Sequence, residues 1–355
     1  MLNDEIDASL LAILREETGE TEIAYAEPPV EIEGGFDTRI FSLRLLNAPW
    51  AYTGSLILRL FAEEDDPLRA RWEGTIQNAV AGLGYPAPRA LLIRSNDSPL
   101  GAAFVVMKRL PGAPMLQAAT FRKMLPEAAR LVARYPGVLA DYLARLHALD
   151  AGALARALEA EGLSAGPSAG ISQRITSLDG QLDQLAGRID RLSLAGLGPA
   201  LQWLRDHRPG EPAQAVICHG DFHPINVLVE GDVVTGVIDW ANTTIEDPAF
   251  DVGNTRLLLA IAPLDQPPVV DVLVGFIRRF VVRRFTRAYV TRRPLDMTSV
   301  RYFEALRCLI ELAWVADRRA TGAGVHRNPW GAPRSVRKLV SHFHDVAGIR
   351  PALNS

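Results

Sequence analysis

The spacing of hydrophobic positions changes along the chain and predicts which elements form. Apolar residues at Ile6, Leu10, Leu11 and Leu14 recur at helical intervals, so residues 2–17 are predicted to form an amphipathic helix. Four later segments have the composition of β-strands: residues 31–46, 55–61, 90–94 and 102–107. A helix is expected over residues 73–83, and beyond Pro111-Gly112 the pattern is predominantly helical. That change indicates a boundary between two lobes.

A short group of strands is predicted inside the helical half. Residues 215–218 are an apolar run, residues 226–230 follow as a strand, and residues 233–240 return after the Gly231-Asp232 turn. Opposed strands of a hairpin place the end of one beside the start of the other. Asp239 is therefore expected to lie beside Asn226.

The polar residues of this region have the spacing of a phosphoryl-transfer loop. Residues 219–226 read His-Gly-Asp-Phe-His-Pro-Ile-Asn, which is the kinase catalytic loop H-R-D-x-x-x-x-N with Gly220 at the Arg position. In that loop the Asp accepts the proton of the substrate hydroxyl and the Asn holds a magnesium ion. We therefore predict that Asp221 is catalytic. Asn226 and Asp239 are the predicted metal ligands, since Mg²⁺ prefers a few hard oxygen ligands.

The order of motifs resembles that of the aminoglycoside phosphotransferase and choline kinase family, in which H-G-D-x-H-x-x-N precedes I-D-[WF]. Residues 105–112, 143–150 and 246–253 are similar to three further motifs of that family. The resemblance runs from about residue 30 to residue 346. It implies an α+β, two-lobed protein-kinase-like fold with a small antiparallel-sheet N-lobe and a larger, mostly helical C-lobe.

This resemblance divides the chain into three parts. Residues 1–22 would be an N-terminal helical extension, residues 23–110 the nucleotide-binding N-lobe, and residues 111–355 the C-lobe with the catalytic loop and the acceptor-binding helices. The resemblance also implies that Met107, Lys108 and Arg109, in the link between lobes, contribute to nucleotide binding.

Further nucleotide-binding residues are expected in the N-lobe. Gly34 and Gly35 form a candidate turn over the nucleotide, because glycines let backbone amides approach phosphate closely. An ordinary hairpin turn is the alternative. By resemblance, Arg59 occupies the position where the family more often has a phosphate-binding lysine, and Glu73 would be its ion-pair partner. Arg keeps the charge but has a different geometry. The alternative is a surface arginine that pairs with Glu63 or Glu64.

Two residues of the helical half are expected to support the loop. By resemblance, Asp251 would accept hydrogen bonds from the backbone of the catalytic loop, although a simple N-cap is the alternative. His147 is expected to pack in the helical core near the loop.

The Arg-rich segment over residues 276–293 has an amphipathic helical pattern, typical of a solvated basic face. A site for an anionic or bulky neutral acceptor is the second interpretation. A polycationic acceptor would need carboxylates, which Glu304, Glu311 and Asp317 could supply only in part.

Two other functions stay open. The cluster of His219, Asp221 and His223 also fits a metal-dependent hydrolase, although the remaining histidines form no comparable cluster. A catalytically inactive, nucleotide-binding pseudokinase is possible on the same fold because Arg59 departs from the usual lysine.

Composition favours an intracellular enzyme. The chain has 355 residues and a net charge of -3, so it has no overall positive potential that would attract nucleic acid. Its two cysteines do not make a disulfide framework. No signal peptide or membrane helix is predicted. We expect a cytoplasmic kinase that uses ATP or GTP with Mg²⁺ and phosphorylates a small-molecule hydroxyl, without nucleic-acid or membrane partners. The acceptor, the preferred nucleotide and the oligomeric state stay open.

Overall fold

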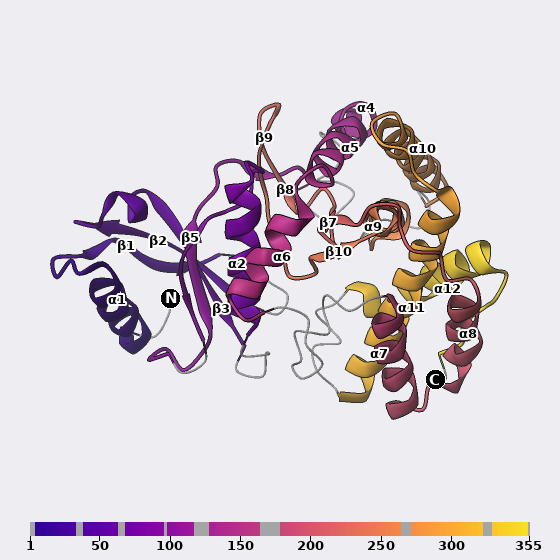
Figure 1. Ribbon diagram of the computed structural model, residues 1–355, viewed down its shortest axis with the longest axis horizontal. Helices are drawn as coiled ribbons and strands as arrows, with labels where there is room; N and C mark the ends of the chain where they lie inside the picture. Colours follow the sequence, from indigo (N-terminus) through magenta and orange to yellow (C-terminus); the bar gives the residue numbers. More distant parts are fainter. Residues whose placement is uncertain are drawn as a thin grey trace. The chain divides into compact units, whose positions relative to one another are not determined.

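A five-stranded antiparallel sheet forms the N-terminal part of the protein, and helices make up most of the rest (Figure 1). The computed structural model describes residues 4–32, 38–62, 68–95, 98–116, 128–163, 178–263, 271–321 and 329–353. The chain divides into two compact units. Unit 1 comprises Met1–Ala113, Gly152–Ser172 and Leu228–Ala241, and unit 2 comprises Pro114–Ala151, Gln173–Val227 and Asn242–Ser355.

The sheet of unit 1 has the order β1-β2-β3-β5-β4. Its strands are β1 (Ala24–Glu31), β2 (Thr38–Leu46), β3 (Ser55–Phe61), β4 (Ala90–Arg94) and β5 (Phe104–Lys108). Helix α1 (Asp4–Thr18) precedes the sheet, and α2 (Arg69–Gly82) joins β3 to β4. Phe104 and Val106 of β5 share a core with α1, whereas Val105 and Met107 share another with α2. Because successive side chains of a strand point to opposite faces, α1 and α2 cover opposite faces of the sheet.

The first strand corrects the sequence-based prediction. A single strand over residues 31–46 was expected, but β1 ends at Glu31 and β2 begins at Thr38. Pro28 and Pro29 kept β1 from being recognised in the sequence, because proline has no N–H to donate to a neighbouring strand. The structure places them on the edge strand, where the pairing with β2 is irregular between Glu27 and Val30. An edge strand tolerates the missing donors.

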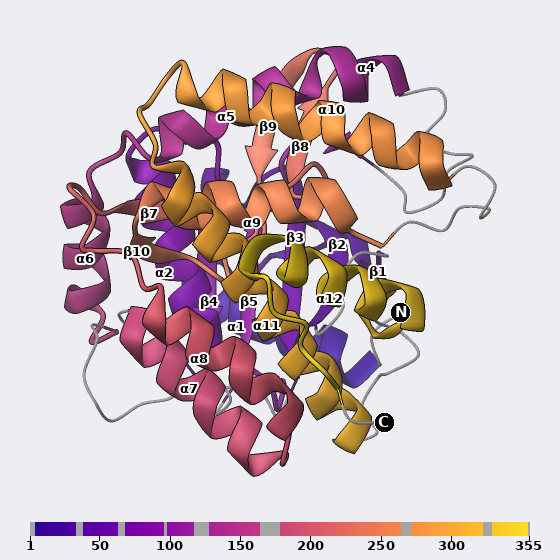
Figure 2. The same cartoon turned by 90° about the vertical axis from the view of Figure 1, so that its right-hand side faces the viewer.

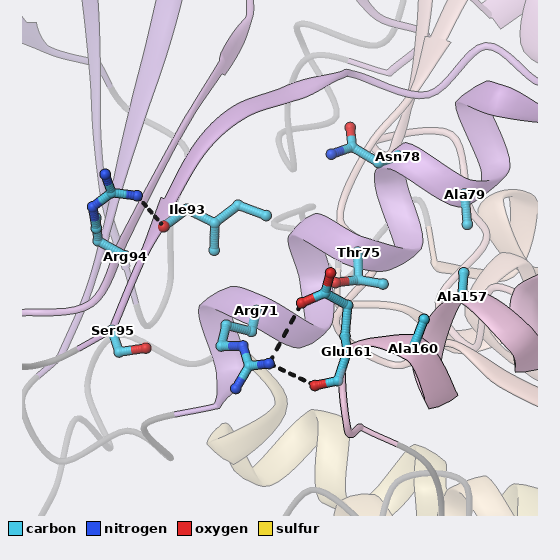
Figure 3. Close-up of a pocket in the computed structure, with 10 residues that line it drawn as sticks. All are labelled: Arg71, Thr75, Asn78, Ala79, Ile93, Arg94, Ser95, Ala157, Ala160 and Glu161. Atoms are coloured by element: carbon cyan, nitrogen blue, oxygen red, sulfur yellow. Dashed lines mark hydrogen bonds and ion pairs between the residues drawn. The ribbon is translucent and has the colours of Figure 1, made fainter. Parts of the chain in front are cut away.

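Unit 1 contains a pocket beside α2 (Figure 3). It has a volume of about 520 Å³ and is lined by residues of α2, of β4 and of α6 (Ala151–Ala160), and by Ser95 and Glu161, which follow β4 and α6. Arg71 donates to the backbone oxygen of Glu161 at 2.5 Å and pairs with its carboxylate at 3.4 Å. None of the predicted site residues lines this pocket.

The hairpin after residues 219–226 consists of β8 (Val227–Glu230) and β9 (Val233–Val237), joined through Gly231-Asp232. The short strand β6 (Ala113–Pro114) belongs to the same sheet. The second strand of the hairpin was expected to reach Trp240, but it ends at Val237. Asp239 has a backbone φ of 68°, in the left-handed region that ends a strand and that Asp tolerates better than most residues.

Unit 2 is built from packed helices (Figure 2). These are α4 (Ala128–Ala133), α5 (Tyr135–Leu146), α7 (Leu178–Arg191), α8 (Gly198–Asp206), α9 (Pro248–Ile261), α10 (Asp271–Val290), α11 (Met297–Thr321) and α12 (Pro333–Ala347). Helix α10 packs on α5 and α9, and α11 packs on α9 and α12. Two short strands, β7 (Val216–Cys218) and β10 (Thr244–Glu246), pair antiparallel beside them.

One glycine allows α9 and α11 to approach closely. A Cβ on Gly253 would lie 2.8 Å from the backbone oxygen of Val300 and 3.0 Å from the Cβ of Phe303. This approach brings α11 against the helix that carries Asp251. Among the described helices, none combines the length and the apolar run that crossing a membrane requires.

Candidate active site

The loop between β7 and β8 holds Asp221 within a dense set of contacts in unit 2. One carboxylate oxygen, Oδ2, lies 3.3 Å from Nε2 of His223 and 3.3 Å from Nδ2 of Asn226. The other, Oδ1, lies 3.2 Å from Nη2 of Arg307. The side chain is 18% exposed, which leaves room for a reacting group to approach. The carboxylate is therefore held in one orientation from both sides.

The charge of Asp221 is maintained by its neighbours. Burial alone would raise the pKa of the Asp221 carboxyl, but His223 and Arg307 oppose that effect and hold the pKa well below its usual range. The carboxyl is thus ionised at neutral pH. An ionised, oriented carboxylate can accept a hydrogen bond from a hydroxyl and later take its proton.

Sequence reasoning missed Arg307. This residue lies on α11, 86 positions from Asp221, and its Nη1 also donates to the backbone oxygen of Gly220 at 3.1 Å. Glu311, one turn later, accepts from its Nε at 2.8 Å. The only trace in the sequence is an Arg-Glu pair at helical i,i+4 spacing, which is common on helix surfaces.

Asp251 fixes the backbone of the loop, as the resemblance implied. Its two carboxylate oxygens accept from the amides of His219 and Gly220, each at 2.7 Å. Nε2 of His147 lies 3.1 Å from the same carboxylate, and its Nδ1 lies 2.6 Å from the Tyr289 hydroxyl. All of these side chains are buried. The predictions for Asp251 and His147 are confirmed.

The N-cap of α9 is a different residue from Asp251. The carboxylate of Asp247 accepts from the amide of Ala249 at 2.7 Å, which satisfies an unpaired donor of the first helical turn. The alternative role considered for Asp251 is therefore filled by the aspartate four positions earlier.

Gly220 is required by the shape of the loop. Its φ is 78°, and a Cβ there would lie 2.2 Å from the backbone oxygen of Asn242. Any other residue would be strained and would collide with backbone. The glycine that replaces the Arg of the kinase motif thus has a local steric cause.

Asn226 presents its amide oxygen as a possible metal ligand. Its Nδ2 donates to the backbone oxygen of Asp221 at 3.0 Å and lies 3.3 Å from the Asp221 carboxylate. This network assigns the amide orientation. Within the part of the chain that the structure describes, no hydrogen bond to the Asn226 side-chain oxygen is present.

The second half of the predicted site lies in unit 1. Nη1 of Arg59 lies 2.6 Å from Oε2 of Glu73, so the expected ion pair is confirmed. Arg59 also donates to the Thr38 hydroxyl at 3.1 Å and lies 3.6 Å from Asp239 Oδ1. Arg69, on α2, pairs with the other oxygen of Glu73 at 3.1 Å. The Arg59 side chain is 13% exposed, so Arg59 is not a surface arginine. Glu63 and Glu64, its alternative partners, lie outside the described residues.

Asp239 is the most accessible acidic residue of this group, with a side chain 43% exposed. It belongs to unit 1 and Asn226 to unit 2, so their convergence on one ion stays a prediction. Trp240, directly after it, is fully buried and packs edge-on against Tyr85 at 5.8 Å. This anchored neighbour holds the backbone that carries Asp239.

The profile of the phosphotransferase enzyme family matches residues 30–295. The chain belongs to this family.

Solved structures of phosphotransferases have the same fold. A candidate aminoglycoside phosphotransferase from Ralstonia eutropha is 18% identical, with a TM-score of 0.63, and the match covers 96% of this chain and 98% of that one. Aminoglycoside phosphotransferase APH(4)-Ia, in a ternary complex with AMP-PNP and hygromycin B, is 16% identical with a TM-score of 0.61 over the same shares. Macrolide 2'-phosphotransferase MphH from Brachybacterium faecium is 19% identical with a TM-score of 0.56, over 93% of this chain and 97% of that one. The predicted two-lobed, protein-kinase-like fold is confirmed.

Curated relatives match a shorter part of the chain. Acyl-CoA dehydrogenase family member 11 from Pongo abelii and from Homo sapiens is 28% identical over 187 residues, and the protein from Gallus gallus is 27% identical over 181 residues. The human match covers 52% of this chain and 22% of the relative. The matched segment is therefore about a fifth of the length of those proteins.

Other predicted nucleotide contacts of this phosphotransferase family member lie at the end of β5. Met107 is buried, Lys108 donates to the backbone oxygen of Thr53, and Nη1 of Arg109 donates to the Ser42 hydroxyl at 3.0 Å. Burial lowers the pKa of Lys108. Gly34 and Gly35 lie outside the described residues. The nucleotide-binding role of all five residues stays a prediction.

The imidazoles beside Asp221 do not share one metal-binding geometry. His219 is buried and its Nδ1 accepts from the Asp221 amide at 3.3 Å, whereas His223 contacts the Asp221 carboxylate. In the described segments, the only group with ligand atoms close enough for a metal is His147, Cys218 and Asp251. The His147 ring and the Asp251 carboxylate of this group are already engaged with Tyr289, with each other and with the amides of His219 and Gly220. This arrangement does not favour the metallohydrolase.

Replacing Arg59 with alanine is expected to raise the nucleotide KM or lower kcat by about 10- to 1,000-fold, the effect of losing a charge-assisted phosphate contact. Arg59→Lys should recover only part of the loss. Because Glu73 holds Arg59, Glu73→Gln should act in the same direction and less than additively with Arg59→Ala. Steady-state kinetics with varied nucleotide measures both constants.

The matched control for these variants is Arg39→Ala, since Arg39 lies on the neighbouring strand β2 and its side chain is 52% exposed. It should leave both constants near the wild-type values. If Arg59→Ala behaves like Arg39→Ala, the phosphate anchor lies elsewhere in the protein.

Proposed function

We propose that this protein transfers the γ-phosphoryl group of ATP or GTP to a hydroxyl of a small molecule, with Asp221 as the general base. The observation that carries the proposal is the Asp221 carboxylate, which is oriented by His223 and Arg307 and is still 18% exposed. A catalytic loop needs this combination, because the carboxylate must align the hydroxyl before it takes the proton.

The residues available for a magnesium ion fit its chemistry. Asn226 has a side-chain oxygen turned away from Asp221, and Asp239 has an accessible carboxylate. Both are hard oxygen donors, of the kind that Mg²⁺ selects, and the nucleotide phosphates and water complete its coordination. When bound, the ion would neutralise charge on the β- and γ-phosphates.

The chain's own residues then account for the transfer. Asp221 orients the acceptor hydroxyl and receives its proton as the oxygen attacks the γ-phosphorus. The bond between that phosphorus and the β-phosphate oxygen breaks, so the products are the phosphorylated acceptor and the nucleoside diphosphate. Arg59, held by Glu73, would stabilise the charge on the phosphates of the nucleotide. A complex of the structural neighbour APH(4)-Ia with AMP-PNP supports an adenine nucleotide as donor.

The test is a panel of hydroxyl compounds read out by nucleotide consumption, with ATP and GTP each in saturating Mg²⁺. We expect acceptor-dependent release of nucleoside diphosphate by the wild type. Asp239→Asn should weaken Mg²⁺-dependent nucleotide binding in calorimetry, and nucleotide affinity in the absence of Mg²⁺ should change little.

A different outcome would favour the pseudokinase. In that case nucleotide binds, but no acceptor in the panel raises its consumption above the acceptor-free rate, and Asp239→Asn leaves affinity in Mg²⁺ unchanged. Failure of the wild type to bind either nucleotide would overturn the assignment of the site.

A further inference from the structure

Helix α11 places a single cation directly against the catalytic carboxylate. The Arg307 guanidinium joins three groups of unit 2: the Glu311 carboxylate at 2.8 Å, the Gly220 carbonyl at 3.1 Å and the Asp221 carboxylate at 3.2 Å. Burial would lower the pKa of Arg307, but Glu311 and Asp221 raise it. This side chain therefore carries a permanent charge, fixed from three directions.

The guanidinium has hydrogen-bonding capacity left beside Asp221. An arginine offers five N–H donors, and the described residues of the protein use three of those of Arg307. One N–H on Nη1 and one on Nη2 remain, on a side chain that is 17% exposed. Each of these N–H groups can donate a charge-assisted hydrogen bond to an oxygen of a carboxylate or phosphate.

The acidic residues of α11 are already paired with cations. Glu304 lies 2.6 Å from Arg256 and 3.5 Å from His342, and Glu311 is held by Arg307. These are two of the three carboxylates that were expected to supply part of a site for a polycationic acceptor.

The third carboxylate is also paired. Asp317 lies 3.9 Å from Arg188 and 3.8 Å from Arg191. Each of the three carboxylates therefore already has an arginine nearby that neutralises part of its charge, and next to the reacting hydroxyl an ammonium group would face Arg307 at close range. This distribution of charge disfavours a polycation.

We propose that Arg307 is a positioning and specificity-determining residue, which fixes the Asp221 carboxylate and binds an anionic group of the acceptor next to the reacting hydroxyl. The inference rests on the proposed phosphoryl transfer and names the acceptor class, a hydroxyl compound with a carboxylate or phosphate. In the transfer, the proton of the hydroxyl passes to Asp221 and the phosphoryl group passes to the hydroxyl oxygen. Arg307 takes part in neither transfer, and it acts on the chemistry by holding Asp221.

Three compounds of matched size test the charge preference: glycerate, glycerol and serinol, which carry a negative, no and a positive charge. Nucleoside diphosphate release is measured with each, for the wild type, Arg307→Met, Arg307→Lys and the control Arg301→Met. Arg301 is an exposed residue of the same helix. The acceptor-free rate and the nucleotide KM are measured in parallel, and thermal unfolding verifies that each variant is folded.

In the wild type, kcat/KM is expected to be about 10-fold or more higher for glycerate than for serinol, with glycerol between them. Arg307→Met should abolish this order and lower kcat by about 10- to 100-fold, with the nucleotide KM within about 3-fold of wild type. Arg307→Lys should keep the charge order but restore only part of kcat, because an ammonium cannot hold Asp221 and Gly220 in the same geometry. Arg301→Met should resemble the wild type.

Several outcomes would overturn the proposal. They are a wild type that prefers serinol, a wild type that responds equally to the three compounds, a wild type that phosphorylates other acceptors of the panel but none of these three, and an Arg307→Met variant that keeps both kcat and the preference for glycerate. Absence of nucleotide binding in the wild type, measured by calorimetry with Mg²⁺ and ADP, would instead contradict the proposed phosphoryl transfer itself. The two failures are therefore distinguishable.

Discussion

Replacing Asp221 with alanine is expected to lower kcat by about 10²- to 10⁴-fold, the contribution typical of a general base. Nucleotide affinity should stay within about 3-fold of wild type, because Asp221 acts on the acceptor hydroxyl rather than on the nucleotide. Single-turnover kinetics measure the chemical step, and calorimetry with Mg²⁺ and nucleotide measures affinity. The change also leaves Arg307 and His223 without their shared carboxylate partner.

The control is Asp190→Ala, since Asp190 is an exposed aspartate on α7. Its kinetics and stability should match those of the wild type. Retention of most acceptor-dependent turnover by Asp221→Ala would remove Asp221 from the role of base. A parallel loss of nucleotide affinity and of folding would mean that the substitution disturbs the loop as a whole.

The second large effect is expected from Asp251. Asp251→Ala removes a fully buried acceptor of two backbone amides, at 2.7 Å each, and the partner of His147. A buried donor left without its acceptor costs about 1 to 3 kcal/mol, so the free energy of unfolding should fall by about 2 to 5 kcal/mol. Turnover should fall as well, because the amides of His219 and Gly220 set the position of Asp221. Urea denaturation and steady-state kinetics measure the two effects.

Asp247→Ala is the matched control, because Asp247 lies on the same turn and caps α9 with a single hydrogen bond. Loss of an N-cap costs about 1 kcal/mol, and turnover should change little. If the two variants lose equal stability and both keep their turnover, the buried carboxylate of Asp251 does not hold the catalytic loop.

Local motifs in the sequence predicted those parts of the protein in which the interacting residues are close along the chain. The strand at residues 90–94 has the predicted bounds, and the loop between β7 and β8 lies where the His-Gly-Asp motif placed it. Short-range spacing determines such elements because turn chemistry and alternation act over a few residues. The pairing of Arg59 with Glu73 was also predictable, but by resemblance to a family rather than from spacing.

Irregular backbone was predicted less well. The edge strand β1 was hidden by Pro28 and Pro29, and Asp239 lies beyond the end of its predicted strand with a φ of 68°. In both cases tertiary context overrides local propensity. An edge position tolerates missing donors, and the buried Trp240 holds the chain that carries Asp239.

Only the tertiary structure identified Arg307 as the partner of Asp221. Helix α11 also carries Arg301, Arg318 and Arg319, and sequence spacing does not distinguish which of its arginines faces the catalytic loop. The close approach of α9 to α11 at Gly253 decides that question. The sequence alone therefore determined the family, the fold and the position of the loop between β7 and β8, since these depend on local motifs and their order. The packing of helices far apart in the chain decided which charges surround Asp221, because that depends on the rotation and depth of each helix.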